Sequence, residues 1–253
     1  MAVTESHLQQ ALSRGAPVWG GWITGLTAIG PEEFARAGYD YVGFDAQHGY
    51  IDDADIARML RRLEHVPIGT AVRLPSADAA PIGRVLDAGA DAIIVAMIES
   101  ADQAAAAVAA TRYPPNGVRS FGPLRASLGV DTVGLEQRVS VFAMIETAAA
   151  LADVDAICAV PGLAGVYVGP ADLAISMGVE VTKANTDPSV RDAIAGIHRA
   201  ATAVGLVPAI HAGNGKVGYT MAERGFQMIT LASESQALRR GAAAGLDEAK
   251  GDR

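Results

Sequence analysis

The segment from Val141 to Gly169 decides the fold of this 253-residue chain. It reads VFAMIE at 141–146, an alanine-rich amphipathic stretch at 148–154, and GVYVG at 165–169. Short β-rich runs that are apolar at nearly every position are typical of strands buried on both faces of a parallel sheet. Two such runs joined by a helical stretch form a βαβ unit, so the segment predicts a parallel sheet covered by helices.

The same alternation runs through the whole chain, with no linker or shift in composition to mark a domain boundary. Eight units in about 250 residues is the number expected of a TIM (β/α)8 barrel, so we predict one α/β domain over residues 1–253. A doubly wound open sheet is the alternative, because periodicity alone does not show whether a sheet closes. We expect strands at 18–23, 41–45, 68–73, 92–97, 141–146, 165–169, 207–210 and 227–231, and helices at 32–37, 54–64, 78–88, 101–112, 148–154, 189–204, 216–224 and 233–244.

Local signals mark the ends of the predicted helices. Gly213–Gly218 fits the G-x-G-x-x-G pattern, but only 35 residues follow Gly218, too few for a dinucleotide-binding unit with its partner. We therefore expect a turn there and no dinucleotide. Asp53 and Ser233 are expected to cap helices. Glycines are expected to end helices at Gly38, Gly89, Gly205 and Gly225.

Composition narrows the classes of function. Lys and Arg number 20 against 28 Asp and Glu, and the net charge of −8 argues against a nucleic-acid partner, because phosphates require a basic surface. The single cysteine, Cys158, excludes an intramolecular disulfide and a cysteine-based zinc site. The longest apolar runs, such as 92–98, are too short to span a bilayer, and residues 1–15 do not resemble a signal peptide. We expect a soluble, cytoplasmic protein without a membrane partner.

Polar residues recur at the carboxyl ends of the predicted strands. In a barrel these ends face the same side, where the loops that follow the strands build the active site. All but one of these residues are ionisable, and their convergence on one rim favours an enzyme. They are Trp22, Asp45, His48, Arg73, Glu146 and Asp172. His211 also ends a predicted strand, but the sequence assigns it no role.

The residue types at the strand ends narrow the reaction class. None of the three lysines, Lys183, Lys216 and Lys250, ends an apolar strand, which disfavours an iminium-forming aldolase. No G-x-S-x-G elbow supports a serine nucleophile. Glu146 and Asp172 instead suit a divalent cation such as Mg²⁺, Mn²⁺ or Co²⁺. A glycosidase also uses two acids, but 5% aromatic residues offer few surfaces for sugar stacking.

The other polar residues suit chemistry at a 2-oxo acid. The turn Gly169-Pro170-Ala171-Asp172 opens a helix whose first N–H groups can hold a carboxylate. Arg73 provides a permanent charge where an enolate develops. Asp45 and His48 can form a hydrogen-bonded pair in which the acid orients the imidazole for proton transfer. The alternative is that His48 only caps its loop.

Five segments resemble the HpcH/HpaI aldolase family, in the family's order and over about residues 20–240. They are GYDYVGFDAQH at 38–48, VR at 72–73, RYPPNGVR at 112–119, MIET at 144–147 and VGPADL at 168–173. The resemblance implies a TIM barrel and a metal-dependent (class II) aldolase, which cleaves 4-hydroxy-2-oxo acids to pyruvate or hydroxypyruvate and an aldehyde. It also implies a homohexamer in which the last helix, about 233–244, is exchanged between neighbouring subunits.

The resemblance also implies a role for each residue at the rim. Glu146 and Asp172 match the acids that bind the divalent metal. Arg73 matches the arginine that contacts the keto oxygen. His48 and Asp45 match the pair that transfers the proton.

Two further positions and three departures complete the resemblance. Trp22 matches a tryptophan that borders the aldehyde, and Asp87 matches an acid that reaches the next subunit's site in some members. The chain has Ala46-Gln47 where many members have Gly-Glu, Met144 where they have glutamine, and Ala96 where they often have proline. These departures leave the choice between pyruvate and hydroxypyruvate open.

Other functions also remain open. Oxaloacetate decarboxylation would use the same enolate, with CO₂ leaving in place of the aldehyde. CoA-thioester lyases of the wider superfamily, which carry an additional lid domain, are a weaker alternative. A non-catalytic barrel that binds a keto acid as a sensor or scaffold would belong to a different class altogether.

Overall fold

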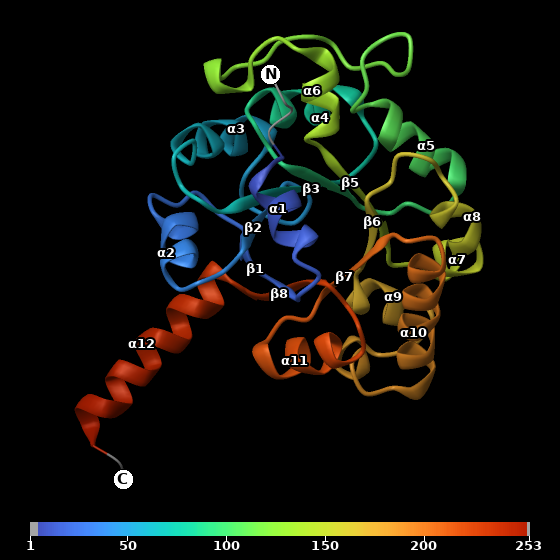
Figure 1. Ribbon diagram of the computed structural model, residues 1–253. Helices are drawn as coiled ribbons and strands as arrows, with labels where there is room; N and C mark the ends of the chain where they lie inside the picture. Colours follow the sequence, from blue (N-terminus) through green and yellow to red (C-terminus); the bar gives the residue numbers. More distant parts are fainter. Residues whose placement is uncertain (1–4, 252–253) are drawn as a thin grey trace.

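The computed structural model describes residues 5–251, and its centre is a closed barrel of parallel strands (Figure 1). Each strand pairs with the next along the chain, and the last pairs with the first to close the ring. The predicted TIM barrel is therefore confirmed, and the open doubly wound sheet is excluded. The strands are β1 (Val18–Ile23), β2 (Tyr41–Asp45), β3 (Gly69–Leu74), β4 (Ala92–Val95), β5 (Ser140–Ile145), β6 (Gly165–Val168), β7 (Val207–His211) and β8 (Met228–Ser233).

Helices follow the strands and surround the barrel (Figure 1). The sequence did not predict α1, which precedes the first strand, or α6, which precedes β5. The helices are α1 (His7–Ser13), α2 (Gly30–Arg36), α3 (Asp53–Arg62), α4 (Ala79–Asp87), α5 (Ala101–Ala109), α6 (Thr132–Gln137), α7 (Ala148–Ala152), α8 (Val154–Cys158), α9 (Pro170–Ser176), α10 (Pro188–Ala203), α11 (Gly215–Glu223) and α12 (Glu234–Lys250), with short 3-10 turns at Ala126–Leu128 and Val181–Lys183.

Side chains of each strand alternate between two cores. On β2, Val42 and Phe44 belong to the core between sheet and helices, whereas Tyr41 belongs to the core inside the barrel. The barrel interior is narrow, because a Cβ on Gly43 would lie 2.1 Å from the Trp22 ring. Both faces of the sheet are buried, which explains why its strands are continuously apolar in the sequence.

Two predicted elements end differently in the structure. The strand expected at 92–97 stops two residues early, and Met97 beyond it has a left-handed φ of 55°. The helix expected at 148–154 divides into α7 and α8 at Asp153, which lies between them. Both differences depend on local backbone conformations that hydrophobic periodicity does not report.

The helix ends follow most of the local signals. Ser233 caps α12 as predicted, and its side chain accepts a hydrogen bond from the Gln236 N–H. The prediction for Asp53 is wrong, because Asp52 is the cap of α3 and accepts from the Asp55 N–H. The G-x-G-x-x-G segment is a turn leading into α11, which confirms that expectation. The predicted glycines Gly38, Gly89, Gly205 and Gly225 follow helix ends with positive φ.

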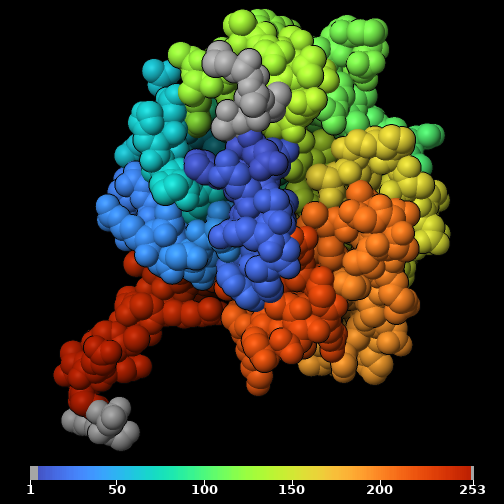
Figure 2. Space-filling view, in the orientation of Figure 1, coloured from blue at the N-terminus to red at the C-terminus, as the bar shows by residue number. Residues whose placement is uncertain are grey.

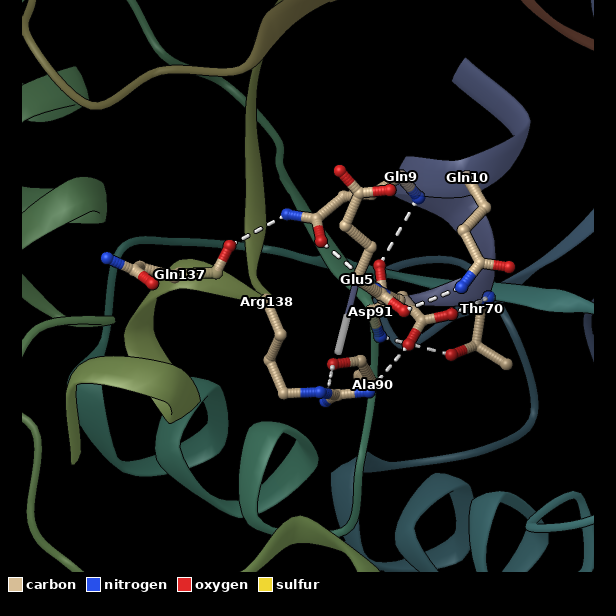
Figure 3. A network of polar contacts seen from close by, with 9 residues as sticks. Glu5, Gln9, Gln10, Thr70, Ala90, Asp91, Gln137 and Arg138 are labelled. Carbon is tan, nitrogen blue, oxygen red and sulfur yellow. Dashed lines mark hydrogen bonds and ion pairs between the residues drawn. The ribbon is translucent and has the colours of Figure 1, made fainter. Parts of the chain in front are cut away.

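The N-terminal end of the barrel is closed by α1 and a network of polar contacts (Figure 3). Asp91, buried directly before β4, accepts hydrogen bonds from the Thr70 N–H at 3.1 Å and from Arg138 Nη2 at 2.9 Å. Burial raises the pKa of Asp91, although the charge of Arg138 opposes the shift. The network is part of the structure at the end of the barrel opposite the predicted site.

The last helix, α12, extends away from the barrel (Figure 2). It has 17 residues and buries none of them. Leu238 and Leu246 are 72% and 53% exposed. Across residues 5–251, no helix combines the length and the hydropathy that a membrane span requires.

Candidate active site

The predicted site residues meet at the carboxyl end of the barrel. Asp45 is the last residue of β2, Arg73 lies near the end of β3, and Glu146 directly follows β5. Trp22, Asp45 and Arg73 contact one another. The charges of Asp172, Arg73 and His48 all influence the pKa of Glu146. The rim inferred from strand order is therefore present in the structure.

Asp45 and Arg73 form a buried ion pair. Arg73 Nε donates to Asp45 Oδ1 at 3.0 Å and Arg73 Nη2 donates to Asp45 Oδ2 at 2.6 Å. The Asp45 side chain is 3% exposed and the Arg73 side chain is 11% exposed. Burial alone would raise the pKa of Asp45, but the hydrogen bonds and the charge of Arg73 outweigh it and lower that pKa. Asp45 is therefore an ionised carboxylate that fixes the plane of the guanidinium.

Trp22 joins this pair from β1. Its indole Nε1 donates to Asp45 Oδ2 at 3.1 Å, and the guanidinium carbon of Arg73 lies 5.5 Å from the centre of its ring system. On the inner side, the Tyr167 ring stacks on Trp22 with a centroid distance of 6.1 Å. Trp22 therefore holds both the acid and the cation in place as well as forming a wall of the site.

The predicted hydrogen bond between the Asp45 carboxylate and the His48 imidazole is not found. Asp45 Oδ1 instead accepts from the backbone N–H of His48 at 3.0 Å and from that of Gln47 at 3.1 Å. The two carboxylate oxygens also accept hydrogen bonds from Arg73 and Trp22, so both are engaged without the imidazole. Asp45 thus orders the loop that carries His48, while the His48 residue itself is exposed.

Glu146 is buried with one oxygen bonded and the other without a partner. Oε1 accepts from the backbone N–H of Met97 at 2.9 Å. Oε2 is buried and bonds to no other described residue. Burial raises the pKa of Glu146 and the charge of Asp172 adds to that shift, whereas the Met97 N–H, Arg73 and His48 oppose it. A buried carboxylate oxygen without a donor is expected where a cation or a ligand binds.

Gly169 makes room for the unpartnered oxygen. A Cβ at this position would lie 2.7 Å from Glu146 Oε2 and 2.7 Å from Met144 Cε. Pro170 follows as the first residue of α9, with Ala171 next to it and Asp172 in the first turn. A side chain on residue 169 would occupy the space beside Oε2, so glycine keeps it open.

The donor set fits a divalent cation that takes two protein ligands. Within residues 5–251, no group of three or more His, Cys, Asp and Glu side chains could hold a metal. Glu146 supplies a buried oxygen without a partner, and Asp172 is close enough for its charge to raise the pKa of Glu146. Mg²⁺ and similar ions take one or two carboxylates and complete their coordination with water and substrate oxygens.

The RYPPNGVR segment has a structural place outside the rim. The Arg119 guanidinium lies 4.8 Å from the centre of the Tyr113 ring and donates from Nη2 to Asp87 Oδ1 at 2.8 Å. The Arg119 side chain is 1% exposed, so this pair anchors the loop after α5. Asp87 is therefore engaged within its own chain, and its reach toward a neighbouring subunit stays a prediction.

Sequence reasoning missed several residues around the site. Met97 provides the backbone donor to Glu146 from a left-handed conformation. Tyr167, Thr230 and Tyr41 place hydroxyl groups inside the barrel. His211, which the sequence placed at a strand end without a role, contacts the Tyr167 hydroxyl from the end of β7. The inward alternation of strand residues was the available signal for these side chains, because each lies on the inner face of its strand.

Together, these features define a (β/α)8 barrel whose carboxyl end carries a two-carboxylate site beside a buried arginine. Residues 19–240 match the family model "HpcH/HpaI aldolase/citrate lyase". Because the match covers most of the chain, the protein belongs to this family.

Individual relatives agree with the family assignment. A "Hydroxypyruvate/pyruvate aldolase" of Rhizorhabdus wittichii is 36% identical over 225 residues, covering 88% of this chain and 90% of the relative. A "4-hydroxy-2-oxovalerate aldolase" of Rhodococcus jostii is 37% identical over 213 residues, covering 81% of each. The crystal structure of an HpcH/HpaI aldolase/citrate lyase family protein from Burkholderia cenocepacia superposes with a TM-score of 0.83 at 30% identity, covering 94% of this chain and 96% of the other.

Proposed function

We propose that the protein is a class II aldolase that reversibly cleaves 4-hydroxy-2-oxo acids to pyruvate or hydroxypyruvate and an aldehyde. The observation that carries the proposal is the buried Glu146 Oε2, which lacks a partner and lies beside the space that Gly169 keeps open. The named activities of the Rhizorhabdus and Rhodococcus relatives support the same reaction.

Glu146 and Asp172 are the residues that would hold the divalent ion, with Mg²⁺, Mn²⁺ and Co²⁺ as the candidates. When bound, such an ion acts as a Lewis acid toward the oxygens of a 2-oxo acid. The turn Gly169-Pro170-Ala171-Asp172 binds the substrate carboxylate in this proposal, because it opens α9 directly beside the two acids.

Arg73 stabilises the negative charge that develops on the keto oxygen during cleavage. Asp45 occupies two of its N–H donors and fixes the orientation of the guanidinium, so the remaining donors are held in place before the substrate binds. Donors that are already oriented cost no reorganisation when the enolate forms. Trp22 holds Asp45 and Arg73 from one side and borders the aldehyde in this proposal.

His48 transfers the proton at the C4 hydroxyl. In cleavage the imidazole accepts this proton, and in synthesis it returns the proton to the new hydroxyl. Asp45 acts on His48 through the backbone, since it accepts the His48 N–H and orders the loop. It is therefore a positioning residue for His48 and the partner of Arg73.

The proposed assembly is a cytoplasmic homohexamer that exchanges α12 between subunits. Its support is that α12 extends from the barrel and buries none of its residues. A chain truncated after Ser233 is expected to sediment as an assembly with fewer subunits than the full chain. An unchanged number of subunits after truncation would contradict the exchange.

The test of the function is a retro-aldol assay with metal-free and reconstituted protein. The metal-free enzyme is expected to be inactive on 4-hydroxy-2-oxo acids and to recover activity with Mg²⁺, Mn²⁺ or Co²⁺. His48→Ala is expected to bind Mn²⁺ like the wild type but to lose about 10²–10⁴-fold in cleavage rate. Full activity of the metal-free enzyme would refute the mechanism. Oxaloacetate, assayed in parallel, would rank decarboxylation against aldol cleavage.

A further inference from the structure

A chain of hydrogen bonds crosses the interior of the barrel and ends at His211. Thr230 Oγ1 lies 2.6 Å from the hydroxyl of Tyr41 and 2.6 Å from that of Tyr167. The Tyr167 hydroxyl in turn lies 3.4 Å from Nδ1 of His211. The chain leads from the closed interior of the barrel to the carboxyl end of β7, where the proposed active site lies.

The direction of these hydrogen bonds follows from the number of donors. Tyr41 and Thr230 are fully buried, and Thr230 is the hydrogen-bond partner of Tyr41 among the described residues. If Nδ1 of His211 carried the ring proton and donated to Tyr167, a hydroxyl proton of Tyr41 or Thr230 would lack an acceptor. The order Tyr41 to Thr230 to Tyr167 to Nδ1 gives each of the three hydroxyl protons an acceptor. Because a buried donor without an acceptor costs free energy, this order is favoured.

The order leaves the ring proton of His211 on Nε2. This nitrogen has no hydrogen-bond partner among residues 5–251, and it is accessible to solvent. The Trp22 ring meets the imidazole edge-on at a centroid distance of 5.3 Å, but the indole N–H is already bonded to Asp45. Nε2–H is therefore a donor without a protein acceptor beside the Arg73–Trp22 stack.

His211 differs from the other groups of the site because it is uncharged. Burial and the positive charge of Arg73 lower its pKa to about 4, with Asp45 opposing the shift, so the ring is neutral at pH 7. The charged groups at the rim are suited to the carboxylate and keto oxygens of the substrate. A neutral N–H donor is suited to a hydroxyl group.

We propose that His211 is a specificity-determining residue whose Nε2–H binds the C3 hydroxyl of a hydroxylated 2-oxo acid such as hydroxypyruvate. The proposal rests on the aldolase function proposed above and concerns the choice of nucleophile. The neighbouring strand supports the placement: β7 pairs with β6, and the turn that follows β6 is the proposed carboxylate site. A C3 substituent of the bound acid would therefore lie near the end of β7.

The first test compares hydroxypyruvate with pyruvate in aldol addition to propanal by the metal-loaded enzyme. His211→Leu is expected to lower the ratio of the two kcat/KM values by about tenfold to a hundredfold, because a buried hydrogen bond to one substrate is lost. His211→Gln and His211→Asn form a matched pair. The Gln amide can reach the position of Nε2, whereas the Asn amide reaches that of Nδ1, so Gln is expected to retain more of the ratio.

Three outcomes would overturn the proposal. The first is that the wild type is active and His211→Leu has the same ratio of kcat/KM values as the wild type. Another is equal loss of the ratio in the Gln and Asn variants. The third is a changed preference between glycolaldehyde and acetaldehyde with an unchanged nucleophile ratio, which would assign His211 to the aldehyde. A wild type that adds neither acid to any aldehyde would instead refute the proposed function itself.

A second test needs no turnover. The ¹⁵N chemical shifts of the His211 ring in metal-free protein report which nitrogen carries the proton. The Nε2–H tautomer is expected in the wild type, and Tyr167→Phe is expected to weaken this preference because Nδ1 loses its donor. An Nδ1–H tautomer in the wild type would contradict the proposed direction of the hydrogen bonds.

Discussion

Arg73 donates two parallel hydrogen bonds to Asp45, so the carboxylate of Asp45 fixes the orientation of the Arg73 guanidinium. Both partners are almost entirely buried. In such a pair each charge depends on the other, because removing one partner leaves the remaining charge without compensation in a site of low polarity.

The first prediction concerns this pair. Asp45→Asn is expected to lower the free energy of unfolding by about 3 kcal/mol, because Arg73 stays charged and buried. The double variant Asp45→Asn/Arg73→Gln removes the uncompensated charge and is expected to recover part of the loss. Denaturant unfolding of the metal-free protein measures both values. An Asp45→Asn variant as stable as the wild type would show that solvent already compensates Arg73.

The second prediction concerns the unpartnered oxygen of Glu146. Glu146→Gln is expected to lose most of its Mn²⁺ affinity, and with it the rise in Tm that Mn²⁺ causes in the wild type. Without metal, the variant is expected to melt at or above the wild-type temperature, because a neutral amide replaces a buried charge. Glu99→Gln is the matched control, since Glu99 is an exposed acid. Equal Mn²⁺ binding by wild type and Glu146→Gln would exclude Glu146 as a ligand.

The third prediction tests the space at residue 169. Gly169→Ala is expected to weaken Mn²⁺ binding and to destabilise the protein by about 1–3 kcal/mol, because the new Cβ would press on Glu146 Oε2 and Met144 Cε. Gly196→Ala in α10 is the control, since the nearest atom to its Cβ is Arg199 Nη2 at 3.8 Å. The control is expected to be neutral or stabilising. Calorimetric titration with Mn²⁺ and thermal unfolding separate the two variants.

The fourth prediction concerns pH. The pKa of His211 falls to about 4 in the folded protein, below the ordinary value of 6.5, so the unfolded chain binds the extra proton first on acidification. The contribution of His211 to the free energy of unfolding is therefore complete above pH 6.5 and is lost as the pH falls toward 4. The loss from this residue is about 3 kcal/mol.

His211→Gln removes this titration and is expected to narrow the stability difference between pH 7.5 and pH 4.5 in urea unfolding. His65→Gln, which changes an exposed histidine, is expected to leave the difference unchanged. Parallel pH dependence of wild type and His211→Gln would mean that other groups dominate acid unfolding.

The sequence was sufficient to predict the barrel, because its strands are buried on both faces and stand out as apolar runs. Strands β1 and β2 were predicted with the bounds that the structure has. The ends of β4 and of the helix after β5 were not predictable in the same way. They depend on a left-handed residue, Met97, and on a break at Asp153, and neither feature changes the apolar pattern.

The placement of the proposed site residues on one rim was predictable, but their contacts were predictable only in part. Strand order alone brought Glu146, Arg73 and Asp45 to one rim, because parallel strands end on the same side. The partner of Asp45 was not predictable, since the choice between a His48 imidazole and its N–H depends on the path of one loop. The role of His211 depends on hydroxyl groups that are distant in sequence and meet only inside the closed barrel.

The C-terminal helix has a consequence for how the protein behaves in dilute solution. An isolated segment of this length that buries none of its side chains is only marginally helical in water, because too little offsets the loss of chain entropy. In the proposed exchange, its helicity comes from contact with another copy. The far-ultraviolet circular dichroism signal contributed by α12 (Glu234–Lys250) should then decrease on dilution before the barrel unfolds, so the helicity of this segment would depend on protein concentration.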